Sequence, residues 1–252
     1  MSRLYYCCGI SDKGAVRSHN EDAYLVNKIV MSHAQVESEI NHPFIAAVAD
    51  GVGGEASGEI ASRMALELLS GVRVGKKVDL RAKLMSIHNR LKRYGITHGG
   101  SANMQTTLCA LAVDDSGRAF SVNVGDSRMY RYRDGVITQL STDQSLVQML
   151  YEQGKITDEE KKTHSQKNVI FPVLGNISDD PDPCVSEIEG GIVKGDIIII
   201  CSDGLSDFIT RGEFEEILSL PMRLPKRLRR LADTAIDNGS TDNVTVVGVS
   251  VI

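Results

Sequence analysis

The sequence predicts an α+β fold in which sheets and helices are layered, and three observations support this. Strand-like apolar or alternating runs occupy residues 24–30, 44–49, 106–113, 118–124, 128–133, 136–140, 197–201 and 244–251. Helical spacing of apolar residues occupies 57–70, 79–94, 145–153 and 224–237. Helices and strands fall into separate blocks instead of alternating strictly, which disfavours a doubly wound parallel sheet.

Length and composition limit the kind of protein. The chain has 252 residues, of which 42% are hydrophobic, so we expect a single domain over residues 1–252. A net charge of −5 disfavours nucleic acid as a partner. No stretch is apolar enough to span a bilayer, and the N-terminal residues lack a signal-peptide pattern, so no membrane association is expected. Five cysteines without framework spacing indicate a reducing, cytoplasmic location.

The first strand run, residues 24–30, follows a short polar segment. That segment contains Arg17, Glu21 and Asp22 within six residues. The guanidinium group of arginine is a planar fork that matches phosphate oxygens. A solvated loop is the alternative interpretation of such a charge run.

Four later strand runs each end at, or begin just after, an aspartate. These aspartates are Asp50, Asp126, Asp203 and Asp242. An unpaired carboxylate next to a buried strand is strongly unfavourable, and coordination of a hard cation such as Mg²⁺ or Mn²⁺ offsets that cost. Each aspartate alone could instead cap a helix or turn. Together with Arg17, the four favour a metal centre that handles phosphate.

The region around Asp50 also has the glycine spacing of a dinucleotide-binding fingerprint, in Gly51, Gly53 and Ala56. We reject that interpretation because Asp50 would place a negative charge beside the pyrophosphate, and no second βα unit with a terminal acid follows.

The middle of the chain contains a hairpin and an insertion. Arg133-Asp134-Gly135 separates the runs 128–133 and 136–140 and predicts a tight turn. Residues 154–190 are polar and contain three of the six prolines, and we expect a flap subdomain over residues 143–190 within the single domain. The last helical stretch, 224–237, places Leu224, Leu228 and Leu231 on one face.

Five motifs occur in one order along the chain. They are Arg17-x-x-Asn20-Glu21-Asp22, Asp50-Gly51-x-Gly53-Gly54, Gly125-Asp126-Ser127-Arg128, Ser202-Asp203-Gly204 and Asp242-Asn243. This pattern, which extends from Asp12 to Val249, resembles the bacterial type of the protein phosphatase 2C family, the metal-dependent serine/threonine protein phosphatases. The resemblance implies a four-layer αββα sandwich: two antiparallel sheets flanked by helices, with a small flap insertion.

The resemblance also implies a site and a reaction. A metal-activated water at a binuclear Mn²⁺ or Mg²⁺ centre would hydrolyse phosphoserine and phosphothreonine in proteins, with a third, weaker metal site nearby. The tight metal pair would be held by Asp50, the Gly51 carbonyl, Asp203 and Asp242. Glu21 and Asp22 would hold metal-bound waters. Asp126, with Asp203, would bind the third metal ion. Arg17 would bind the phosphate of the substrate.

The implied partners are phosphoprotein substrates and a cognate serine/threonine kinase, and a monomer is expected. Two alternatives are weighed against this. A non-catalytic regulatory module that keeps the fold would be expected to have lost ligands, whereas every ligand position is filled here. A phosphatase with an aspartyl nucleophile would need a paired Asp-x-Asp at a strand end, which Asp50-Gly51-Val52 does not supply.

The chain departs from the family pattern at Val52, which stands where animal members carry a histidine proposed as general acid. The resemblance therefore assigns no residue as proton donor to the leaving group.

Overall fold

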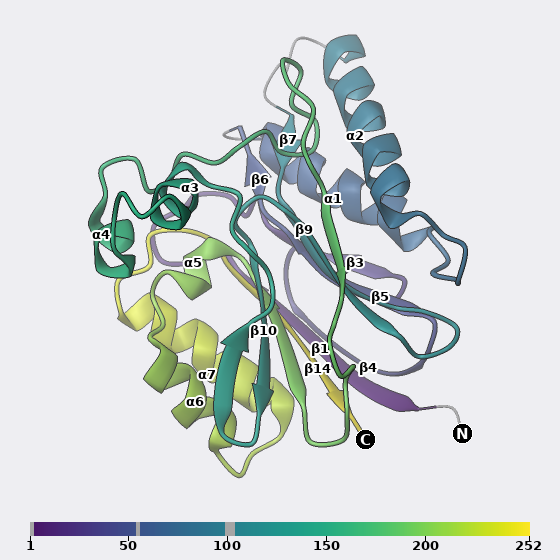
Figure 1. The fold of residues 1–252 in the computed structure, drawn as a ribbon, viewed down its shortest axis with the longest axis vertical. Coiled ribbons are helices and arrows are strands. Elements are labelled where there is room, and N and C mark those ends of the chain that lie inside the picture. The colour runs from purple at the N-terminus through teal and green to yellow at the C-terminus, as the bar shows by residue number, and fades with distance from the viewer. Residues whose placement is uncertain (1–2, 54–55, 99–103) are drawn as a thin grey trace.

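The structure is a computed structural model that describes residues 3–53, 56–98 and 104–252. Gly54, part of one motif, lies outside the described residues. Two six-stranded antiparallel sheets stack face to face (Figure 1). The first sheet has the order β11 (Val136–Gln139), β10 (Arg128–Arg133), β13 (Ile197–Cys201), β14 (Val244–Val251), β1 (Leu4–Asp12), β4 (Gln35–Asn41). The second has the order β12 (Cys184–Glu187), β9 (Ala119–Val124), β8 (Leu108–Val113), β5 (Phe44–Ala49), β2 (Ala23–Val26), β3 (Ile29–Met31).

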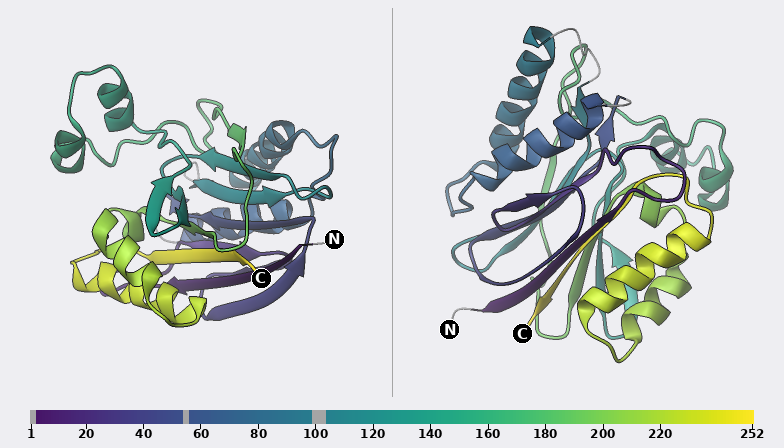
Figure 2. Two further views of the ribbon diagram at one scale, coloured as in Figure 1. Left: turned by 60° about the horizontal axis from the view of Figure 1, so that its bottom comes forward. Right: turned by 180° about the vertical axis from the view of Figure 1, so that it is seen from behind.

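Helices cover both outer faces, as Figure 2 shows. The helices α1 (Ala56–Ser70) and α2 (Leu80–Thr97) pack on the second sheet. The helices α5 (Asp203–Ser206), α6 (Arg211–Ser219) and α7 (Leu224–Asp237) pack on the first. The predicted four-layer αββα sandwich is therefore confirmed.

Three hydrophobic clusters hold the layers together. The middle cluster lies between the sheets and contains Tyr5, Leu111 and Ile200, all fully buried. The outer clusters join each sheet to its helices, through Leu84 on one side and Leu228 on the other. Strands in the middle layers are buried on both faces, which explains why β5, β8 and β13 are continuously apolar rather than alternating.

Several predicted boundaries need correction. The predicted strand 24–30 is wrong as a single element: β2 and β3 form a hairpin, and Asn27 has a φ of 58°, which turns the chain. The run 106–113 likewise divides into β7 (Gln105–Thr106), which pairs with β6 (Gly51–Val52), and β8. The predicted hairpin turn is confirmed, since Asp134 and Gly135 both have positive φ between β10 and β11.

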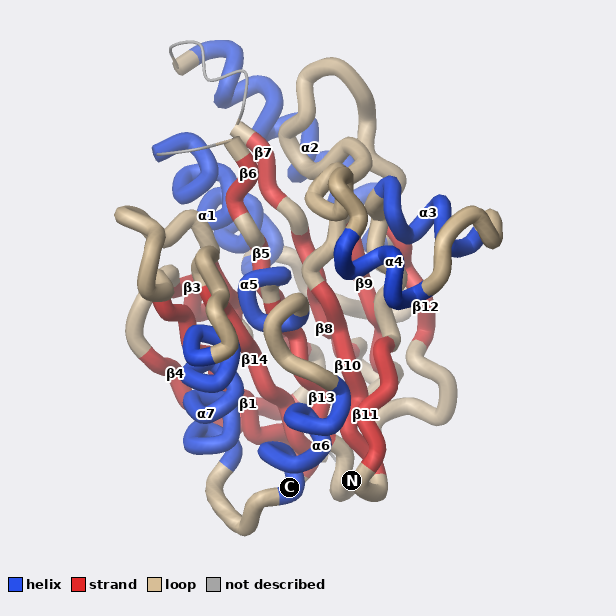
Figure 3. Tube along the Cα trace, turned by 90° about the vertical axis from the view of Figure 1, so that its left-hand side faces the viewer, coloured by secondary structure: helices blue, strands red, loops and turns tan. Residues whose placement is uncertain are grey.

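Residues 144–171 leave the body of the molecule and return to it (Figure 3). This α3–α4 segment contains α3 (Leu146–Glu152) and α4 (Asp158–Thr163). Its two ends meet, because the backbone N–H of Phe171 donates to the carbonyl of Gln144 at 2.9 Å. Further along the range expected as a flap, β12 pairs with β9 as the edge of the second sheet. In the described part of the chain, no helix has the length and hydropathy needed to cross a membrane.

Candidate functional site

The acidic motifs converge because their strands begin or end at one edge of the two sheets. In the first sheet, Asp12 pairs with Val244, so the end of β1 and the residues just before β14 are adjacent. In the second sheet, Ala23 pairs with Ala49, so the residues preceding β2 and following β5 are adjacent. Segments far apart in sequence therefore meet at this edge, as we expected from the position of the aspartates.

Hydrogen bonds join the two sheets at the site. Ser202, which follows β13, donates from Oγ to Asp22 Oδ2 at 2.7 Å. Asn243 accepts at Oδ1 from the backbone N–H of Glu21 at 2.8 Å. The amide of Asn243 also donates to the carbonyls of Lys13 and His19, at 2.9 Å each, and so fixes the loop that carries Arg17. These contacts order the side of the site contributed by the N-terminal segment.

Asp50 is held by two threonines whose role the sequence did not reveal. Thr106 Oγ1 donates to the Asp50 carbonyl at 2.9 Å, and the Thr107 N–H donates to the same oxygen at 2.9 Å. Thr107 Oγ1 in turn accepts from the Asp50 N–H at 3.1 Å. The feature of the sequence that could have identified them is a pair of adjacent hydroxyl side chains directly before the apolar run 108–113.

Gly51 lies where two backbones come very close. A Cβ at this position would lie 2.3 Å from the carbonyl oxygen of Gly58 and 2.7 Å from that of Glu21. The Gly51 N–H donates to the Glu21 carbonyl at 3.2 Å. The glycine thus allows the start of α1, the strand β6 and the Glu21 segment to pack in one place.

The carboxylates repel one another. Burial raises the pKa of Asp50 well above its usual range, and four neighbouring carboxylates raise it further. These neighbours are Asp22, Asp203, Asp126 and Asp242. Burial likewise raises the pKa values of Asp22, Asp126 and Asp203. The structure therefore brings five of the predicted acidic residues close enough together for their charges to interact, and a bound cation would offset the repulsion between them.

Arg17 supplies part of that positive charge in this structure. Its Nη2 lies 2.6 Å from Asp242 Oδ2, with 48% of the arginine side chain and 34% of the aspartate side chain exposed. Within the residues that the structure describes, no three His, Cys, Asp or Glu side chains are already arranged as a group that could hold a metal ion. Asp242, one of the predicted ligands, instead pairs with the guanidinium of Arg17.

The donor set nevertheless fits a hard divalent cation. Among the described residues, Asp203 Oδ1 is a buried carboxylate oxygen without a hydrogen-bond partner, which is costly unless something else satisfies it. The remaining candidates are carboxylates and one backbone carbonyl, all oxygen donors. Mg²⁺ and Mn²⁺ prefer such ligands.

Comparisons with known proteins point to one family. A family model described as protein phosphatase 2C matches residues 18–236. The chain is 32% identical to the serine/threonine protein phosphatase PstP of Mycobacterium tuberculosis over 255 residues, which cover 96% of this chain and 44% of that protein. It is 31% identical to the serine/threonine phosphatase stp of Listeria monocytogenes over 249 residues, covering 94% of this chain and 92% of that protein.

A solved structure adds a metal-loaded relative. The catalytic domain of the serine threonine protein phosphatase PstP, in complex with two manganese ions, superposes with a TM-score of 0.78. It is 31% identical, and the match covers 99% of each chain. The present chain spans less than half the length of the mycobacterial protein it resembles, so it corresponds to one part of that protein.

Proposed function

The chain belongs to the protein phosphatase 2C family, and from that premise we propose that it is a metal-dependent enzyme that hydrolyses phosphoserine and phosphothreonine in proteins. The observation that carries the proposal is the convergence of Asp22, Asp50, Asp126, Asp203 and Asp242 at one edge of the sandwich. The relatives named as serine/threonine phosphatases support the same activity.

We propose two tight cation sites and a third, weaker one. The tight pair would be held by Asp50, the Gly51 carbonyl, Asp203 and Asp242, with Glu21 and Asp22 around them. Asp126 would serve the third site with Asp203. When bound, two such cations activate water for attack on phosphorus and neutralise charge on the phosphoryl oxygens.

The chain's own residues prepare this site. Ser202 and Asn243 fix the segment that carries Asp22 and Glu21, and the paired threonines fix the backbone of Asp50. We propose that Arg17 binds phosphoryl oxygens of the substrate through its planar guanidinium group. Asp242, which pairs with Arg17 in this structure, would instead help to hold a cation, and the half-exposed side chain of Arg17 would then be available to the phosphoryl group.

The test is hydrolysis of a phosphothreonine peptide and of p-nitrophenyl phosphate by the purified chain with Mn²⁺. Asp203→Asn should reduce kcat by at least about 100-fold, because it removes a ligand charge at a buried position. Asp233→Asn, an exposed aspartate on α7, is the matched control and should leave the rate unchanged. Full activity in the Asp203 variant would refute the ligand assignment.

The alternative of a non-catalytic module is tested in the same experiment. Mn²⁺ binding measured by calorimetry, without turnover of either substrate, would favour a regulatory role. Cation binding should also raise the thermal unfolding midpoint of the wild-type chain, and a chelator should reverse the rise, since a ligand that binds only the folded state stabilises it.

The setting of the enzyme is also a proposal. We propose a monomer in the cytoplasm that reverses the action of a serine/threonine kinase. All five cysteines are free, four of them buried, which is compatible with a reducing compartment.

A further inference from the structure

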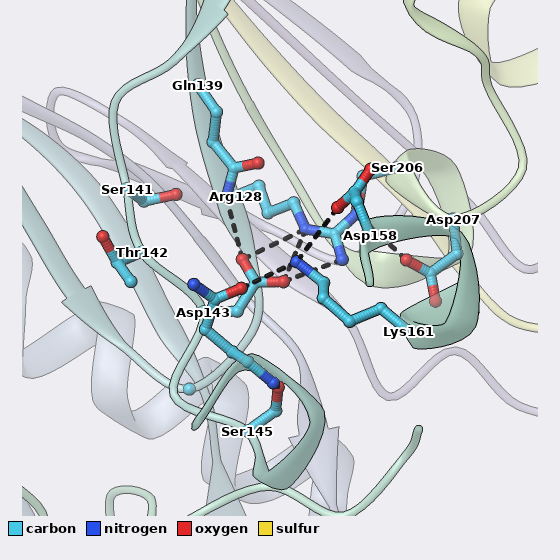
Figure 4. A network of polar contacts seen from close by, with 12 residues as sticks. Arg128, Gln139, Ser141, Thr142, Asp143, Ser145, Asp158, Lys161, Ser206 and Asp207 are labelled. Atoms are coloured by element: carbon cyan, nitrogen blue, oxygen red, sulfur yellow. Dashed lines mark hydrogen bonds and ion pairs between the residues drawn. The ribbon is translucent and has the colours of Figure 1, made fainter. Parts of the chain in front are cut away.

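Arg128 lies in a network of polar contacts that includes Asp143 and Asp207 (Figure 4). Its Nε lies 2.9 Å from Asp143 Oδ2 and its Nη2 lies 2.8 Å from the same oxygen, while Nε also lies 3.1 Å from Oδ1. Its Nη1 lies 3.0 Å from Asp207 Oδ1. Only 19% of the arginine side chain and 6% of the Asp143 side chain are exposed. One guanidinium therefore holds two carboxylates with its two edges.

The three residues come from three different elements, and each element carries or adjoins a candidate ligand. Arg128 begins β10, two residues after Asp126. Asp207 immediately follows the short helix α5 as its C-cap, and its N–H donates to the carbonyl of Asp203 at 2.9 Å. The guanidinium thus joins the segment that carries Asp126 to the helix that carries Asp203.

The second carboxylate connects Arg128 to the α3–α4 segment. Asp143 immediately precedes that segment and also accepts from Gln139 Nε2 at 2.9 Å. The next residue, Gln144, is bonded to Gly125 twice: its N–H donates to the Gly125 carbonyl at 2.9 Å, and its Oε1 accepts from the Gly125 N–H at 2.9 Å. The base of the α3–α4 segment is therefore fixed one residue away from Asp126.

We propose that Arg128 is a positioning residue that sets the separation of Asp126 and Asp203 and anchors the α3–α4 segment beside the site. The planar fork is essential to this role, because a lysine would keep the charge but could not hold Asp143 with two nitrogens and Asp207 with a third. Without the guanidinium, the Asp143 and Asp207 carboxylates would repel Asp126 and Asp203, and α5 would move away from β10.

A comparable pair on the same strand provides the control. Arg133, at the other end of β10, holds Asp196 through Nε at 2.6 Å and Nη2 at 2.7 Å. The Asp196 side chain is only 1% exposed. The two pairs thus share residue types, two-nitrogen geometry and burial of the carboxylate, but only Arg128 adjoins candidate ligands.

The experiment compares Arg128→Lys with Arg133→Lys in the full chain, using Mn²⁺ binding by calorimetry and circular dichroism as a check on folding. Arg128→Lys should weaken Mn²⁺ binding by roughly 10–100-fold, the effect typical of groups that orient metal ligands. Arg133→Lys should leave the Mn²⁺ affinity within about twofold of wild type. Equal Mn²⁺ affinities for the two variants would overturn the proposal.

Variants of Asp207 and Asp143, the two carboxylates that Arg128 holds, test the positioning of the ligands and the anchoring of the α3–α4 segment separately. They remain informative if Arg128→Lys does not fold. Asp207→Asn should weaken Mn²⁺ binding. Asp143→Asn should raise KM for a phosphothreonine peptide severalfold more than KM for p-nitrophenyl phosphate, because Asp143 lies at the base of the α3–α4 segment and p-nitrophenyl phosphate has no peptide chain that could contact that segment. If neither variant differs from wild type, Arg128 has a purely structural role and the proposal is wrong.

The peptide measurement rests on the proposed phosphatase function, whereas the Mn²⁺ measurement does not. A wild-type chain that binds Mn²⁺ but hydrolyses neither substrate would refute the proposed function alone. In that case, the Mn²⁺ affinities of the Arg128 and Arg133 variants would still decide the positioning role.

Discussion

Gly204 gives the sharpest steric test of how the site is assembled. It follows Asp203 in α5 and packs against the residues that precede β14. A Cβ at this position would lie 2.0 Å from the Asn243 carbonyl oxygen and 3.2 Å from Asp242 Cβ. Its φ lies outside the left-handed region, so alanine can adopt its backbone conformation, and the effect of Gly204→Ala should come from packing alone.

The expected magnitude follows from the overlap. Real Cβ atoms do not approach a heavy atom within 3.0 Å, so the Asp203 and Asp242 segments must separate by at least about 1 Å. Overpacking of this kind costs about 1–3 kcal/mol of unfolding free energy. Displacing groups at an active site by about 1 Å can cost roughly 100-fold in rate. We therefore expect kcat/KM to fall by about that factor in Gly204→Ala, together with a loss of Mn²⁺ affinity.

The assay combines urea denaturation without metal, Mn²⁺ calorimetry and p-nitrophenyl phosphate kinetics. Gly212→Ala is the control, because a Cβ there meets nothing within 4 Å and Gly212 lies in α6. That variant should gain about 0.5–1 kcal/mol from the reduced flexibility of the unfolded chain. A Gly204→Ala variant that matches wild type in unfolding free energy and in Mn²⁺ affinity would refute the steric role of Gly204.

Two further predictions concern stability away from the site. Burial lowers the pKa of His88, whose Nδ1 accepts from the Gly175 N–H at 3.1 Å, although the charge of Asp180 partly opposes the shift. The pKa of His88 in the folded state lies below the unfolded value of about 6.5, so the unfolding free energy should fall as the pH drops below 6.5. Urea denaturation at pH 7.5 and at pH 5.5 should therefore show a smaller fall in unfolding free energy for His88→Gln than for wild type. An equal fall in both proteins would contradict this. Leu111→Ala leaves a cavity between the sheets and should lower the unfolding free energy, measured by urea denaturation, by about 2–5 kcal/mol. Leu111→Met keeps most of the volume and should lower it by less than about 1.5 kcal/mol. Similar values for the two variants would contradict close packing between the sheets.

Most of the fold could be predicted because its signals are local. Continuous apolar runs predict the central strands β5, β8 and β13, which are buried on both faces. The elements that were missed give weaker signals. The edge strand β4 has only one buried residue, and α5 is only four residues long, too short to show a period. The sequence pattern also did not predict β1, although six of its nine residues are buried, five of them consecutively.

The sequence by itself determined which residues could form the site, because a carboxylate at the end of an apolar run is costly wherever the strand lies. It could not determine which strand ends meet. Only the tertiary structure decided that Arg17 pairs with Asp242, 225 residues away, and that Ser202 bonds Asp22, 180 residues away. It also decided that Arg128 holds both Asp143 and Asp207. These contacts depend on strand order and register in two stacked sheets, and spacing along the chain carries no information about either.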